Sequence, residues 1–159
     1  AAVEEKRVRV KNRPEFFGRQ LLIGPDDEPV GEETDLLVNA TQLSLEDAAR
    51  LASEYRGTAL PAHIEREANG ILAVLGELPE KPEFGCVEIR YPERLDELVR
   101  EHPALKGKKI VVSSDAHSLW RIQDPGFAIE LPCPPDADDQ TVRDALIDYL
   151  AGAADGGRA

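Results

Sequence analysis

The chain has 159 residues, a length that suits one domain with a hydrophobic core of its own. With 42% hydrophobic and 31% charged residues the composition is that of a globular protein, and no apolar run approaches the ~20 residues of a membrane span. The net charge of −12 disfavours binding to extended nucleic acid, which generally requires a basic surface. We therefore expect a soluble, cytoplasmic protein. The start at Ala1 and the absence of Met suggest that the numbering begins inside a longer protein, and removal of an initiator Met is the alternative.

Short apolar runs at residues 20–23 and 36–38 flank the turn-rich segment Gly-Pro-Asp-Asp-Glu-Pro at residues 24–29, which predicts a hairpin-like excursion. A helix is expected next. Ser44 can cap it, apolar residues recur at helical spacing, and Gly57 ends it.

From residue 58 onward the pattern alternates between short apolar runs and helical segments. The expected strands are residues 58–60, 87–89, 110–112 and 127–129, and the expected helices are residues 68–75, 93–101 and 139–151. This alternation predicts an α/β fold with a largely parallel sheet. Functional residues of such folds follow directly on strands.

The two cysteines predict neither a disulfide framework nor a metal site. Cys86 begins an apolar run and is interpreted as a small buried hydrophobe, whereas Cys133 lies in a Pro-Cys-Pro-Pro loop.

Three residues that follow expected strands are candidate metal ligands: His63, Asp115 and His117. In an extended segment, residues two apart project to the same side, so Asp115 and His117 can point to one site. A carboxylate with neutral imidazoles suits Zn, Mn or Fe, and such an ion can activate water and neutralise phosphate oxygens. Structural roles, such as a hydrogen-bonded His63 or a helix cap at Asp115, stay open at this point.

Two motifs add a resemblance to a known family. Pro61-Ala62-His63-Ile64-Glu65-Arg66 and Ser113-Ser114-Asp115-Ala116-His117 resemble the third and fourth motifs of the PHP (polymerase and histidinol phosphatase) superfamily. The runs from Lys11 to Gly18 and from Leu43 to Gly76 resemble the second half of bacterial PHP-domain phosphoesterases, so that the similarity covers most of residues 11–150. It implies a distorted (βα)7 barrel with two or three metal ions at its mouth.

The resemblance also implies roles for individual residues. His63 matches the ligand of the third motif, and Asp115 and His117 match the pair of the fourth. Arg66 is a candidate phosphate clamp, because guanidinium offers a bidentate fork to phosphate oxygens; a surface salt bridge with a neighbouring glutamate is the alternative. Glu88 is a candidate for contact with the site.

The chain lacks other parts of the family pattern. No His-x-His strand, no second motif and no bridging Glu are found, and the remaining histidine, His102, is expected to be exposed. Residues 1–151, with an excursion around residues 18–40, are thus interpreted as the C-terminal half of a partial (βα)7 barrel, and residues 152–159 as a frayed tail. Exposed strand edges predict weak stability and no activity in the absence of the N-terminal half.

The leading hypothesis is therefore part of a metal-dependent phosphoesterase for a small phosphorylated substrate. A non-catalytic fragment that pairs with another chain is the alternative, and a nuclease or DNA-repair relative is less favoured because of the acidic net charge.

Overall fold

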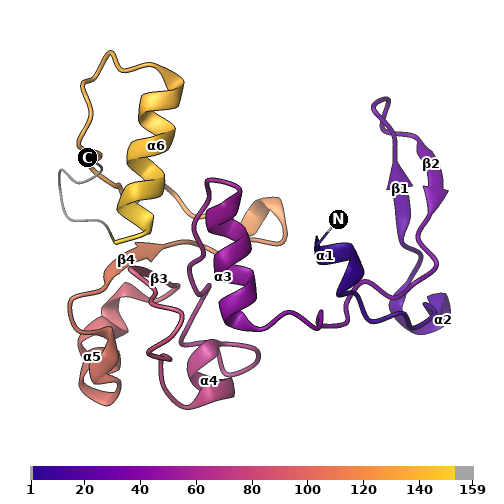
Figure 1. Ribbon diagram of the computed structural model, residues 1–159, viewed down its shortest axis with the longest axis horizontal. Helices are drawn as coiled ribbons and strands as arrows, with labels where there is room; N and C mark the ends of the chain where they lie inside the picture. The colour runs from indigo at the N-terminus through magenta and orange to yellow at the C-terminus, as the bar shows by residue number, and fades with distance from the viewer. Residues whose placement is uncertain (1, 153–159) are drawn as a thin grey trace. The chain divides into compact units, whose positions relative to one another are not determined.

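The computed structural model describes residues 2–152 and consists of two compact units, Ala1–Ser44 and Leu45–Ala159 (Figure 1). The excursion expected around residues 18–40 lies within the first unit. Of the expected frayed tail, residues 153–159 lie outside the described part of the chain. Each unit is considered by itself below.

The first unit contains a β-hairpin and two short helices. Its elements are α1 (Ala2–Glu5), α2 (Pro14–Phe17), β1 (Leu21–Ile23) and β2 (Pro29–Glu32). The hairpin is antiparallel, and its tight turn is closed by a hydrogen bond from Gly24 N–H to the carbonyl oxygen of Glu28 (2.9 Å). Because the turn closes so early, residues 29–32 pair with β1, and the prediction of residues 36–38 as the second run was wrong. Leu36 is instead buried, and its N–H donates to Val10 O.

Ion pairs contribute to the first unit. Asp35 accepts hydrogen bonds from Lys11 (2.8 Å) and Arg9 (3.1 Å), and residues 11 and 35 also form an antiparallel bridge. The Lys11 ammonium, followed by the Arg9 guanidinium, lowers the pKa of Asp35. Charged contacts thus join residues 9–11 to residue 35 within this unit.

The second unit is a mixed α/β structure with a small parallel sheet. Its helices are α3 (Leu45–Glu54), α4 (Ile71–Leu75), α5 (Leu95–Glu101) and α6 (Asp139–Leu150), its strands are β3 (Cys86–Ile89) and β4 (Lys109–Val112), and its short 3-10 helices are η1 (Pro92–Arg94), η2 (Pro103–Leu105) and η3 (Leu119–Arg121). The helices predicted over residues 44–57, 93–101 and 139–151 are present, and that over 68–75 is shorter than expected.

Strands β3 and β4 pair in parallel, with Val87 opposite Ile110. Both were predicted. The runs 58–60 and 127–129 are not strands in the described structure. Pro61 explains the first case, because proline has no N–H to donate; only its carbonyl oxygen pairs, with Glu88 N–H (2.9 Å). A three-residue apolar run such as 127–129 does not by its periodicity distinguish a strand from a loop.

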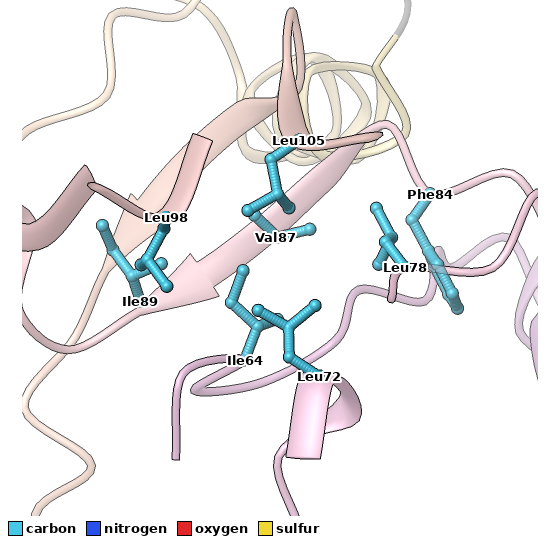
Figure 2. Packing of buried hydrophobic residues seen from close by; sticks show 8 residues of the cluster. All are labelled: Ile64, Leu72, Leu78, Phe84, Val87, Ile89, Leu98 and Leu105. Atoms are coloured by element: carbon cyan, nitrogen blue, oxygen red, sulfur yellow. The ribbon is translucent and has the colours of Figure 1, made fainter. Parts of the chain in front are cut away.

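The core of this unit lies against β3 (Figure 2). Strand β3 is buried at every position except Glu88, whereas every residue of β4 is only half-buried. The clustered side chains come from β3, from the helices and from the segments between them: Ile64, Leu72, Leu78, Phe84, Val87, Ile89, Leu98 and Leu105. Burial of these side chains supplies the main stabilising term.

Helix α6 begins at an N-cap, where Asp138 accepts a hydrogen bond from the N–H of Thr141 (2.7 Å). That bond lowers the pKa of the Asp138 carboxyl. The end of α6 approaches the start of β3 so closely that a Cβ on Gly85 would collide with the carbonyl group of Ala151. A glycine at this position therefore allows the contact.

Two further predictions from the sequence can be compared with the structure. His102 is not exposed as expected, since its side chain is only 20% accessible and its Nδ1 lies 3.5 Å from Glu77 Oε2. In the described part of the chain, no helix is long and apolar enough to cross a membrane.

Candidate functional site

The candidate residues lie around the carboxyl ends of β3 and β4. Parallel strands end at the same edge of a sheet, and Ser113 N–H donates to Ile89 O (3.3 Å) just beyond the paired residues. Arg90 follows β3 directly, and Asp115 follows β4 after two serines. The segment around His63 reaches the same edge through its backbone bonds with Glu88.

His63 is held by Glu88. Its N–H donates to Glu88 Oε1 (3.2 Å), while the next N–H, that of Ile64, donates to the carbonyl oxygen of Glu88 (3.0 Å). His63 has a backbone φ of +34°, which is uncommon for a residue other than glycine. Its Nδ1 is buried and has no hydrogen-bond partner among the described residues. Glu88, a candidate for contact with the site, therefore acts on the backbone of His63.

Asp115 pairs with Arg66 across the site. Arg66 Nη1 donates to Asp115 Oδ2 (3.2 Å), and the Asp115 side chain is 19% exposed against 50% for Arg66. The glutamates beside Arg66, which were the expected alternative partners, form no ion pair with it in the described structure. One bond to Asp115 leaves most of the five guanidinium donors of Arg66 available to an anion.

His117 lies beside Asp115, with its Nδ1 3.7 Å from Asp115 Oδ1, but it does not line the hollow described below. Asp115 has a φ of +47°, so the chain is not extended there and the rule that residues two apart share a side does not hold. The His117 side chain is 73% exposed, and its Nδ1 lies 2.8 Å from the backbone oxygen of Asp115.

We name the hollow that these residues line the charged pocket. It has a volume of about 380 Å³, and its lining includes His63, Glu65, Arg66, Arg90, Arg94 and Asp115. His117 is not among the lining residues. The structure thus brings two of the three expected ligands, and the expected phosphate clamp, to one pocket.

Glu65 and Arg90 are site residues that the sequence reasoning missed. Glu65 Oε1 accepts the N–H groups of Arg90 (2.5 Å) and Tyr91 (3.0 Å), and so joins the His63 motif to the end of β3. The rule that functional residues follow strands applies to Arg90 as well as to Asp115, and could have identified it.

Two neighbouring pockets adjoin the charged pocket. A larger one, of about 660 Å³, shares Arg90 and Tyr91 with it and is also lined by Ser114, Gln123 and Phe127. An apolar one, of about 450 Å³, shares His63 and lies between α3 and α4. The charged pocket is therefore the centre of a group of three.

The fit to a metal ion is partial. The unpartnered Nδ1 of His63 and the half-buried carboxylate of Asp115 are suitable ligand groups. However, no cluster of three or more His, Cys, Asp or Glu side chains able to hold a metal ion occurs within residues 2–152. These residues alone do not form a complete metal site, and we derive no reaction step through a metal.

Comparisons with known proteins place the chain in no family. No protein-family model matches it, and neither the curated proteins nor the solved structures contain a match.

Proposed function

We propose that the chain is the C-terminal part of a PHP-type (βα)7 barrel and belongs to a metal-dependent phosphoesterase that acts on a small phosphorylated substrate. The observation that carries the proposal is the meeting of His63, Asp115 and Arg66 at the charged pocket, although the first two are 52 positions apart in the sequence (115 − 63). Two metal-ligand types beside a guanidinium match the needs of phosphoester hydrolysis.

In this proposal the described residues bind and orient rather than complete the chemistry. Arg66 steadies the phosphate while its bond to Asp115 holds both side chains in place. Glu88 holds the backbone of His63. His63, Asp115 and His117 are proposed as ligands of Zn, Mn or Fe. Since two of them line the pocket, a site of two or three ions requires further ligands from outside the described residues.

Metal binding tests this proposal. We would titrate Mn²⁺ and Zn²⁺ into the chain by calorimetry and measure hydrolysis of 4-nitrophenyl phosphate, using the wild type and the variants His63→Ala and Asp115→Ala. We expect weak metal binding that both variants abolish, and no turnover. The control is His102→Ala, since His102 lies outside the charged pocket. A longer form of the protein with any upstream segment would be assayed in parallel and is expected to turn over.

The outcomes separate the parts of the proposal. Wild-type metal affinity in both His63→Ala and Asp115→Ala would show that these residues are not ligands. Stoichiometric metal and turnover in the 159-residue chain would show that its site is complete. Circular dichroism of each variant checks that a loss of binding is not a loss of folding.

The second candidate function, binding to another chain, is favoured by a different observation. Large apolar side chains on α2 and the hairpin are open to solvent: Phe16 (69%), Phe17 (56%), Leu22 (51%), Ile23 (55%) and Val30 (71%). A two-stranded hairpin also leaves strand edges unpaired. Sedimentation equilibrium of the wild type and of Val30→Asp would test this. Concentration-dependent association that the substitution removes supports it, and a monomer throughout contradicts it.

A further inference from the structure

Unpartnered polar atoms concentrate at the charged pocket. Six buried side-chain nitrogen or oxygen atoms in the described part of the chain lack a hydrogen-bond partner. Three of them belong to residues that line this pocket: His63 Nδ1, Glu65 Oε2 and Arg90 Nε. Buried polar groups are nearly always hydrogen-bonded, so such a concentration calls for a partner that the chain does not itself supply.

Arg90 is the most informative of the three. Its side chain is a permanent cation, and its Nε–H can only donate. Arg66 is paired with Asp115 and Arg94 with Glu97 (3.2 Å), whereas Arg90 forms no ion pair within residues 2–152. Leaving a donor of a charged group buried without a partner is costly, and an oxyanion removes that cost. Arg90 is therefore the arginine of this pocket whose charge is not already matched by a carboxylate.

The surroundings hold Arg90 in place before any ligand arrives. Its backbone N–H and that of Tyr91 both donate to Glu65 Oε1, which fixes the turn after β3. Its guanidinium carbon lies 5.4 Å from the centre of the Tyr91 ring, within the range of a cation–π contact. A binding group that is already ordered loses less entropy when it binds a ligand.

Arg90 also lies where two pockets meet. It lines both the charged pocket and the larger pocket. A group bound there lies at the pocket that His63 and Asp115 also line, and the larger pocket offers about 660 Å³ for the rest of the ligand.

We infer that Arg90, through Nε and the adjoining guanidinium nitrogen, binds an oxyanion of the ligand at this junction, with Glu65 as the residue that positions it. The choice of phosphate as the anion rests on the proposed function; the binding itself requires neither metal nor catalysis.

The test is a titration with inorganic phosphate in the presence of EDTA, followed by ¹⁵N NMR, in which the arginine Nε–H signals are observed directly. We expect one Nε–H signal to shift, and to be absent in Arg90→Gln and Arg90→Lys. The phosphate affinity of both variants should fall roughly 10- to 100-fold, since hydrogen bonds to charged groups are worth this much. Arg90→Lys keeps the charge and loses Nε, so it separates hydrogen bonding from general attraction.

The control is Arg100→Gln, which removes an exposed arginine that lines neither the charged pocket nor the larger pocket. Its phosphate affinity should stay within about twofold of wild type, because exposed charges outside the site are screened. Equal affinities of wild type and Arg90→Gln, or no phosphate binding by the wild type, would overturn the inference. Because EDTA removes metal, a failure of the metal and hydrolysis experiments leaves this result unaffected.

Discussion

The burial of Ile64 beside the charged pocket allows a quantitative test of the core. Its side chain is 0% exposed, and it follows His63 directly, so the core holds this end of the site in place. Ile64→Ala deletes three buried carbon groups. At about 0.8 kcal/mol for each, the lost transfer free energy is about 2.4 kcal/mol, and the cavity left behind raises the total to about 3–4 kcal/mol.

The loss should appear in the free energy of unfolding, measured by urea denaturation with far-ultraviolet circular dichroism. The matched control is Val74→Ala, also a truncation of a β-branched residue, at a position that is 67% exposed. We expect the control to change the free energy of unfolding by less than about 0.5 kcal/mol. A loss below about 1 kcal/mol for Ile64→Ala, or one equal to that of the control, would refute the packing around β3 described above.

Three other predictions concern the rest of the second unit. Gly85→Ala should destabilise it by about 1–3 kcal/mol in the same assay, because the added methyl group meets the end of α6, whereas Gly126→Ala, whose Cβ would meet only an oxygen at 3.8 Å, should not. The pKa of Asp138 is lowered in the folded protein, so the ionised carboxyl stabilises the fold. This contribution to the free energy of unfolding is fully present above the ordinary carboxyl pKa and is lost as the pH falls through the lowered pKa of the folded state. Asp138→Asn keeps a capping group that does not titrate, so its melting temperature should fall less on acidification; equal declines would contradict this. Burial raises the pKa of the Cys86 thiol, so a thiol reagent should modify the other cysteine first and Cys86 only on unfolding, and fast reaction of both would be the contrary result.

The sequence predicted the regular elements best where a long pattern was available. The helix expected over residues 139–151, for example, is present as α6 (Asp139–Leu150). Three-residue apolar runs were less informative: the runs 87–89 and 110–112 lie in strands, whereas the runs 58–60 and 127–129 do not. Residues 58–60 form no strand, and the backbone hydrogen bonds to β3 begin at Pro61.

The sequence indicated which residues belong to the candidate site, but not how each side chain is oriented there. Asp115 follows β4 as expected, whereas the run before His63 forms no strand, yet both residues line one pocket. The placement of His117 depended on the backbone of Asp115, whose positive φ takes the chain out of an extended conformation and leaves His117 exposed beside Asp115. No sequence period reports such a residue, since Asp and Asn adopt this conformation only in particular turns.

The positive φ values of His63 and Asp115 have a consequence for how substitutions at the site affect folding. A left-handed conformation costs an ordinary L-residue about 1–2 kcal/mol relative to glycine, and His and Asp are among the residues that tolerate it best. Glycine at either position would relax the backbone while removing the imidazole or the carboxylate. A screen that rewards thermal stability alone would therefore discard these two side chains, whereas a screen for ligand binding would keep them. Strain at two positions that carry candidate ligand groups is a reason to test them for binding, because strained residues cluster at binding and active sites.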